Sequence, residues 1–126
     1  MSPRLVPATV SELARIPLFS GFSGRDLTEL AAAMRREQVA PGAAVVREGE
    51  DGDRFYVVLS GVLTVSQEAL GPRRVLRPGD TFGEVALALD VPRTASVRAM
   101  TPVVVVSCDR ATFDRYVRPL FADDAG

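Results

Sequence analysis

Two residue types on which many enzymes rely are scarce in this chain of 126 residues. Histidine, the commonest general base and metal ligand, is absent. Cysteine occurs once, at Cys108, which excludes an internal disulfide and a cysteine-based zinc site. Without histidine this thiol cannot form the usual cysteine–histidine catalytic pair. We therefore expect no metal site and no enzymatic activity, and the apolar run around Cys108 indicates a buried thiol.

Long apolar runs and a strong net charge are also missing. No run approaches the roughly 18 apolar residues of a membrane span, and the N-terminus has no signal-peptide pattern. The formal net charge is −1 at pH 7, so no overall basic field would attract nucleic acid or an anionic membrane. We expect a cytoplasmic chain that contacts neither nucleic acid nor membrane by itself.

The length and the composition predict one domain. The chain is long enough for one hydrophobic core, and its 47% apolar and 25% charged residues are typical of a globular protein. We expect a loose lead-in over residues 1–8, one domain over residues 9–121 and a polar tail over residues 122–126.

Helix signals come first along the chain. Thr9 and Glu12 have the spacing of a capping box, which predicts a short helix that ends at Pro17. Ser23 can cap a second helix that continues through about Arg36, because apolar residues recur there three and four apart.

Beyond Gln38 the pattern changes to that of short strands. Glycine and proline turns separate β-prone runs every eight to twelve residues or so. The predicted strands cover residues 43–47, 54–59, 62–66, 73–76, 94–99 and 103–108. We expect an antiparallel roll or barrel of seven or eight strands, followed by a helix capped by Asp109. The acidic stretch 48–53 does not match a calcium loop and is interpreted as a solvated turn.

One segment breaks the β pattern. Residues 82–89 are rich in helix formers and poor in β-branched residues, which predicts a short helix that begins at Glu84 and ends before Pro92. The first N–H groups of a helix have no partner within it and suit an anion. Gly83 allows close backbone approach, and Arg93 can bring a guanidinium to the same place. Such a site fits a ligand with hydroxyl and phosphate groups, which describes a nucleotide.

A family resemblance rests on two runs of residues, Phe82-Gly83-Glu84-Val85-Ala86-Leu87 and Pro92-Arg93-Thr94-Ala95-Ser96-Val97. Together they resemble the phosphate-binding cassette of cyclic-nucleotide-binding domains. These domains occur in the bacterial catabolite activator protein, protein kinase regulatory subunits and cyclic-nucleotide-gated channels. The resemblance extends over roughly residues 9–120. It implies a mainly β fold, an antiparallel β-roll (double-stranded β-helix, jelly-roll-like), with the phosphate-binding helix inside the roll and helices at both ends.

The resemblance also implies a role for each cassette residue. Glu84 would accept hydrogen bonds from the ribose 2′-hydroxyl, and Arg93 would pair with the exocyclic phosphate oxygens. Main-chain N–H groups near Ala86 and at Thr94 would complete the phosphate site. The predicted ligand-binding residues are Gly83, Glu84, Val85, Ala86, Arg93, Thr94 and Ala95.

Two residues, Thr94 and Arg74, are candidates for contact with the base of the nucleotide. In cGMP-dependent protein kinases a threonine directly after the cassette arginine, and an arginine on the preceding strand, favour guanine. Thr94 and Arg74 stand at the matching positions, so Arg74 is a candidate base contact. Because cAMP-preferring channels also carry this threonine, we expect cAMP or cGMP as ligand and discrimination within about tenfold, ~1.4 kcal/mol.

Two functional hypotheses follow. The first is a regulatory module that binds a cyclic nucleotide and uses no cofactor. The second is a structural or interaction module that keeps the same roll and works without ligand. Family members carry a longer helix after the short one that begins near Ala111, and here the chain ends at Gly126. We therefore expect a shortened or missing lid helix and a larger parent protein, with the effector domain or partner protein outside this chain.

Overall fold

Two antiparallel sheets form the body of the molecule. The computed structural model describes residues 6–122. Its strands are β1 (Val6–Pro7), β2 (Arg35–Val39), β3 (Ala44–Val46), β4 (Arg54–Ser60), β5 (Leu63–Gln67), β6 (Gly71–Leu76), β7 (Thr81–Phe82), β8 (Ser96–Ala99) and β9 (Val103–Asp109). One sheet has the order β1-β2-β9-β4-β7 and the other β3-β8-β5-β6. The mainly β fold, an antiparallel β-roll with flanking helices, is confirmed.

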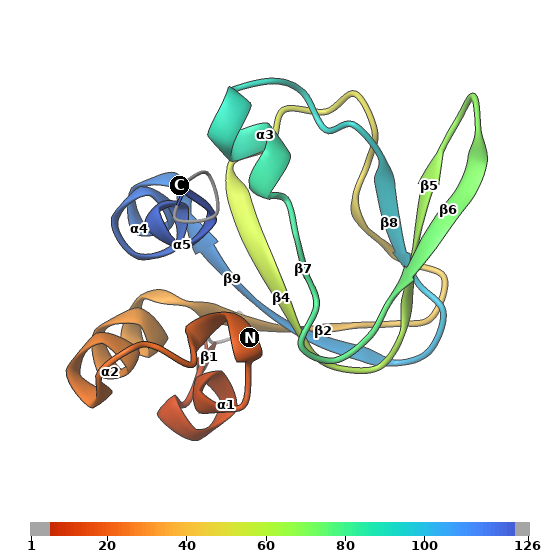
Figure 1. The fold of residues 1–126 in the computed structure, drawn as a ribbon. Coiled ribbons are helices and arrows are strands. Elements are labelled where there is room, and N and C mark those ends of the chain that lie inside the picture. The colour runs from red at the N-terminus through yellow and green to blue at the C-terminus, as the bar shows by residue number, and fades with distance from the viewer. Residues whose placement is uncertain (1–5, 123–126) are drawn as a thin grey trace, which may run out of the picture.

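Helices lie at both ends of the chain and between the sheets. They are α1 (Val10–Ala14), the 3-10 turn η1 (Pro17–Phe19), α2 (Gly24–Ala33), α3 (Glu84–Leu89), α4 (Arg110–Thr112), the π-helical η2 (Phe113–Val117) and α5 (Arg118–Ala122). Figure 1 shows α3 at the open end of the roll, with the N- and C-terminal helices together on one side. None of the helices within residues 6–122 has the length and apolar character required to cross a membrane.

The predicted helix caps are present. Thr9 and Glu12 form the capping box of α1, with both backbone-to-side-chain bonds in place at 3.0 and 3.1 Å. The Ser23 hydroxyl accepts a hydrogen bond from an N–H in the first turn of α2, and Asp109 does the same at the start of α4. In each cap the donor and the acceptor lie three residues apart, so the sequence alone is enough to predict these hydrogen bonds.

The predicted end of the second helix is wrong. The sequence predicts a helix through about Arg36, but α2 ends at Ala33 and Met34 is already extended, with φ −98° and ψ 142°. The next five residues form β2, which pairs along its whole length with β9. Pairing with a buried central strand therefore outweighs the helical propensity of these residues.

The predicted lead-in over residues 1–8 also needs correction at its end. Val6 and Pro7 form β1 and pair with Arg36 and Arg35 of β2. Ala8 is buried and its N–H donates to the carbonyl of Met34 at 3.2 Å. Residues 1–5 of the lead-in and residues 123–126 of the tail lie outside the described part of the chain.

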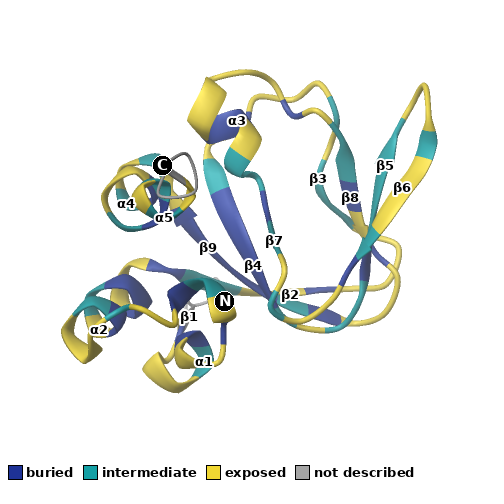
Figure 2. Cartoon of the chain, in the orientation of Figure 1, coloured by how far each residue is buried: buried dark blue, intermediate teal, exposed yellow. Residues whose placement is uncertain are grey.

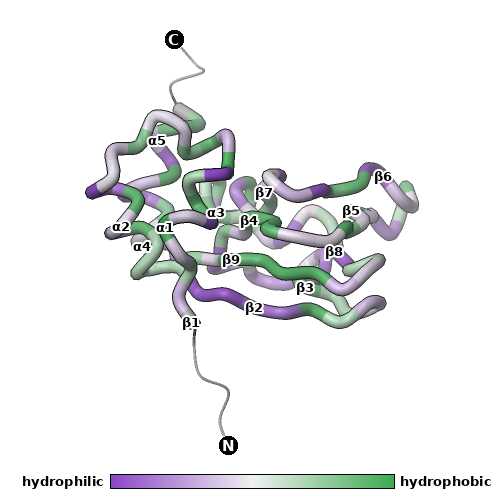
Figure 3. Tube along the Cα trace, turned by 90° about the horizontal axis from the view of Figure 1, so that it is seen from below, coloured by the Kyte–Doolittle hydropathy of each residue, from purple (hydrophilic) through white to green (hydrophobic). Residues whose placement is uncertain are grey.

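The core is divided between two clusters that meet at β4. Figure 2 shows β4 and β9 buried over most of their length. Phe55 points to the cluster under the terminal helices, and Tyr56 points to the cluster inside the roll. Figure 3 shows the apolar β9 beside the hydrophilic β2. Cys108 lies in the first cluster with no exposed surface, and its burial raises the pKa of the thiol to about 12.

Candidate functional site

A glycine turn places the start of α3 at the open end of the roll. Gly83 has φ +97°, a conformation that side chains other than glycine rarely adopt, and it leads directly from β7 into Glu84. Ala86 and Leu87 are buried and fix the inner face of α3. The helix ends at Leu89, before Pro92, so the short helix predicted from the sequence is confirmed.

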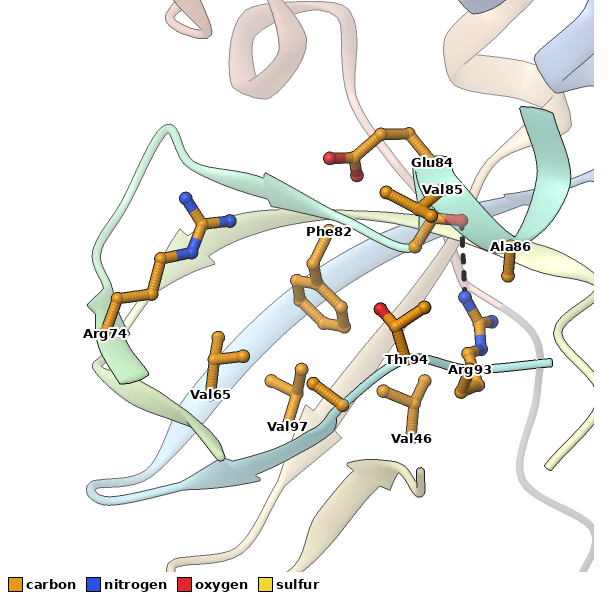
Figure 4. Close-up of a pocket in the computed structure, with 12 residues that line it drawn as sticks. Val46, Val65, Arg74, Phe82, Glu84, Val85, Ala86, Arg93, Thr94 and Val97 are labelled. Carbon is orange, nitrogen blue, oxygen red and sulfur yellow. Dashed lines mark hydrogen bonds between the residues drawn. The ribbon is translucent and has the colours of Figure 1, made fainter. Parts of the chain in front are cut away.

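The predicted site residues line one pocket. Their positions on α3, on the segment before β8 and on β6 are far apart in the sequence, and the roll brings them together (Figure 4). The pocket holds about 490 Å³, including the part open to solvent. Its predicted members are Arg74, Gly83, Glu84, Val85, Ala86, Arg93, Thr94 and Ala95. Their roles toward a ligand stay a prediction.

Four apolar side chains complete the wall of the pocket. They are Val46, Val65, Phe82 and Val97, from β3, β5, β7 and β8. Phe82 stacks on Tyr56 with ring centroids 4.8 Å apart and planes 5° apart. Sequence analysis assigned no ligand role to these residues, because each belongs to a different strand and only the closed roll juxtaposes them. They give the pocket an apolar side opposite its charged end.

Arg93 is the buried charge of the pocket, with 7% of its surface exposed. Its Nη2 donates to the carbonyl of Arg54 at 2.9 Å, and its Nη1 donates to the carbonyl of Gly83 at 3.3 Å. The guanidinium also lies over the ring of Tyr56, with Cζ 5.9 Å from the ring centroid. Two of its five N–H donors are therefore held by main-chain oxygens, which fixes the plane of the guanidinium.

The charge of Arg93 lacks an ion-pair partner in the described part of the chain. Among the ion pairs within residues 6–122, none includes this guanidinium. Burial lowers the pKa of Arg93, while Tyr56, Asp53 and Glu84 act in the opposite direction. A buried cation is costly unless an anion accompanies it. This arrangement is suited to an anionic ligand.

Glu84 presents the complementary feature. Its Oε2 is buried and has no hydrogen-bond partner in the described part of the chain. Figure 4 shows the carboxylate directed away from the Arg93 guanidinium, so the two opposite charges of the pocket do not satisfy one another. Since buried acceptors in folded proteins are almost always hydrogen-bonded, a donor from a ligand would fit here.

The loop between β3 and β4 closes over the back of Arg93. The N–H of Gly49 donates to the carbonyl of Arg93, and the N–H of Arg93 donates to the carbonyl of Glu50, both at 2.8 Å. Gly52 is buried against the guanidinium. The interpretation of stretch 48–53 as a solvated turn is therefore wrong at Gly52, which sequence analysis missed because no local pattern indicates contact with a residue 41 positions away.

The two candidate base contacts lie at the solvent edge. Thr94 is exposed, and its carbonyl accepts a hydrogen bond from Gln67 Nε2 at 3.0 Å. Arg74 is also exposed and sits opposite Val65 in the β5–β6 pair. Figure 4 shows Arg74 across the pocket from Arg93. The charged end of the pocket is therefore more firmly held than the edge that would face a base.

Sequence comparison assigns most of the chain to one family. The Cyclic nucleotide-binding domain family model matches residues 36–119. The cAMP-dependent protein kinase regulatory subunit of Yarrowia lipolytica is 39% identical over 109 residues, 86% of this chain and 29% of that protein. The cGMP-dependent protein kinase of Caenorhabditis elegans is 36% identical over 114 residues, 86% of this chain and 15% of that protein. The chain thus spans less than a third of these curated relatives.

Solved structures give the same result for the fold. The regulatory domain of Toxoplasma gondii protein kinase A with cAMP superimposes with a TM-score of 0.83 at 30% identity, covering 92% of this chain and 48% of that one. The regulatory subunit of a cAMP-independent protein kinase A from Trypanosoma brucei superimposes with a TM-score of 0.86 at 26% identity, covering 92% and 43%. Domains of this fold therefore occur in kinases described as cAMP-independent, and the side chains of the site must decide the ligand.

Proposed function

Because the chain belongs to the cyclic nucleotide-binding domain family, we propose that it binds cAMP or cGMP in the pocket beside α3. The observation that carries the proposal is the pair of unsatisfied charges. Arg93 is a buried cation without a carboxylate partner, and Glu84 Oε2 is a buried acceptor without a donor, both as judged over residues 6–122. A cyclic nucleotide carries an anion and a hydroxyl on one rigid ring system and can satisfy both.

Each end of the ligand has its own partners. The exocyclic phosphate oxygens would accept hydrogen bonds from the free N–H groups of Arg93 and from the main-chain N–H groups near Ala86 and at Thr94. The ribose 2′-hydroxyl would donate to Glu84 Oε2. Gly83 and Val85 would lie beside the ribose, and the apolar wall would face the rest of the ligand. Binding would leave the nucleotide chemically unchanged.

Base preference is proposed to be weak. Thr94 and Arg74 are both exposed, so a hydrogen bond from either to a base competes with water and contributes little. The similar proteins include a cAMP-dependent and a cGMP-dependent kinase by name. We therefore keep both nucleotides as ligands, with affinities within about tenfold.

The output is proposed to be regulatory rather than catalytic. The relatives that match over most of this chain include regulatory subunits of protein kinases. By analogy this domain would change the activity of an effector domain or partner protein, a protein kinase being the class that the relatives suggest. The cytoplasmic location and the absence of contacts with nucleic acid and membrane stay predictions.

One observation favours a second function. The Trypanosoma brucei regulatory subunit described as belonging to a cAMP-independent kinase has this fold with a TM-score of 0.86. A roll that serves assembly or autoinhibition without a cyclic nucleotide is therefore the alternative. Arg93 and Glu84 favour the ligand-binding function, since a purely structural roll needs neither a buried cation without an ion-pair partner nor a buried carboxylate oxygen without a donor, as both are found within residues 6–122.

Calorimetric titration separates the two functions. The purified domain is titrated with cAMP, with cGMP and with 5′-AMP, whose phosphate is not part of a ring. Saturable binding of one nucleotide per chain, with 5′-AMP much weaker than cAMP, supports the proposal. Absence of heat and of thermal stabilisation at millimolar cAMP and cGMP would leave the structural module as the function.

A further inference from the structure

Two glycines enclose the slot that holds the Arg93 guanidinium. A Cβ atom at Gly83 would lie 2.8 Å from Arg93 Nη1. A Cβ atom at Gly52, on the other side, would lie 2.6 Å from Arg93 Nε and 2.7 Å from Cζ. Real Cβ atoms essentially never come closer than 3.0 Å to such neighbours. Any side chain at position 52 would therefore push on the guanidinium.

Space alone explains the glycine at position 52. Gly83 has φ +97° and would be strained with another residue whatever its surroundings. Gly52 is not among the glycines with positive φ, so no left-handed backbone requires glycine there. What a side chain would meet at Gly52 is the guanidinium of Arg93 and, at 2.8 Å, the Cβ of Ala86 on α3. The close approach of the β3–β4 loop to the pocket is what requires glycine.

The loop cannot easily move aside. Two main-chain hydrogen bonds of 2.8 Å join the loop to Arg93: the N–H of Gly49 donates to the carbonyl of Arg93, and the N–H of Arg93 donates to the carbonyl of Glu50. On its other side, the guanidinium is held by the carbonyls of Arg54 and Gly83. A methyl group added between them has to displace the guanidinium or break these bonds.

We propose that Gly52 is a positioning residue for the anion of the ligand. It leaves the space in which Arg93 is held with its remaining N–H groups free for the phosphate. The inference rests on the proposed function, because it concerns the side chain proposed to bind that phosphate. It adds a determinant of affinity from the β3–β4 loop, outside the two runs, residues 82–87 and 92–97, that resemble the phosphate-binding cassette.

A double-mutant cycle tests the inference with two readouts, cAMP affinity and the thermal midpoint without ligand. The variants are Gly52→Ala, Arg93→Ala and the double variant, with Gly21→Ala as the control. Nothing lies within 4 Å of a Cβ atom added at Gly21, so the control reports the general effect of a glycine-to-alanine change. We expect Gly52→Ala to weaken cAMP binding on the order of tenfold and to lower the midpoint, and Gly21→Ala to do neither.

The decisive comparison is the cost of Gly52→Ala when Arg93 is absent. If Gly52 acts through Arg93, the alanine weakens residual binding less than about twofold in the Arg93→Ala background, and its effect on the midpoint shrinks likewise. Equal costs in both backgrounds would overturn the inference and leave Gly52 as a packing residue of the loop.

Two further outcomes are also decisive. If Gly52→Ala alone does not fold, a folded double variant supports the contact with Arg93, and an unfolded double variant assigns the clash to Ala86 and overturns it. If the wild-type domain binds no cyclic nucleotide, the proposed function fails, while the midpoint cycle still reports whether Gly52 and Arg93 are coupled.

Discussion

Replacement of Arg93 by alanine is the perturbation with the largest expected effect on binding. The guanidinium is 7% exposed and already oriented by two main-chain carbonyls, so little ordering is needed when a phosphate arrives. A hydrogen bond to a charged group contributes about 1.5–3 kcal/mol, and a phosphate can accept two from one guanidinium. Because such contributions are not additive, we expect a loss of roughly 2–4 kcal/mol, about 30- to 700-fold in Kd.

The fold is expected to tolerate this change. Without ligand, Arg93→Ala removes two hydrogen bonds to carbonyls but also removes a buried charge that has no anionic partner among residues 6–122. These effects oppose each other, and the free energy of unfolding should change by about 1 kcal/mol or less. Circular dichroism and the thermal midpoint of the ligand-free protein check this expectation.

The assay is a calorimetric titration of wild type and three variants with cAMP. Arg93→Lys keeps the charge but loses the planar fork and should fall between wild type and Arg93→Ala. Arg98→Ala is the matched control, because Arg98 is exposed and donates to the carbonyl of Gly42 outside the pocket. Equal affinity of wild type and Arg93→Ala, or an equal loss in the control, would refute the assigned role.

Three further predictions follow from the same geometry. Glu84→Gln should lose less cAMP affinity than Glu84→Ala, because the amide oxygen can still accept a hydrogen bond. Wild type should bind 2′-deoxy-cAMP more weakly than cAMP, whereas Glu84→Ala should bind both equally. If Glu84→Ala showed the same preference for cAMP over 2′-deoxy-cAMP as wild type, the ribose would lie elsewhere. Thr94→Ala should reduce cGMP affinity more than cAMP affinity, and a strong cAMP preference untouched by the change would place base recognition at other residues. Burial raises the pKa of the Cys108 thiol to about 12, above the value of about 8.5 for a free thiol. The contribution of the buried thiol to the free energy of unfolding is therefore complete below about pH 8.5 and is lost as the pH rises toward 12. At pH 8 an aromatic disulfide reagent should therefore label Cys108 only as fast as the protein unfolds, and rapid labelling of folded protein would contradict its burial.

Sequence alone reaches the parts of the site that are local. Gly83, Glu84 and the helix that follows form one continuous segment, so neighbouring residues suffice to predict the turn and the start of the helix. The capping box of Thr9 and Glu12 is predictable for the same reason. The six predicted strands match β3, β4, β5, β6, β8 and β9 to within two residues at each end, since glycine and proline turns separate most of them, whereas β1, β2 and β7 were not predicted.

Features that depend on distant residues could not be predicted in this way. The strand β2 follows a helix without a turn signal, and only pairing with β9 makes it a strand. The carbonyl of Arg54 accepts a hydrogen bond from Arg93, and Gly52 leaves the space for its guanidinium. Both residues lie about 40 positions from Arg93 in the sequence. The sequence therefore indicates which residues carry charge into the pocket, whereas the structure indicates what holds the guanidinium and which charges lack partners.

A crystal structure of the domain with cAMP would show directly whether the pocket beside α3 binds the nucleotide. We expect the exocyclic phosphate oxygens within hydrogen-bond distance of Arg93 and of the N–H groups at the start of α3. We also expect the ribose 2′-hydroxyl to donate to Glu84 Oε2, with Arg93 still held by the carbonyls of Arg54 and Gly83. A nucleotide bound elsewhere, or an unchanged empty pocket in crystals grown with saturating cAMP, would contradict the proposal.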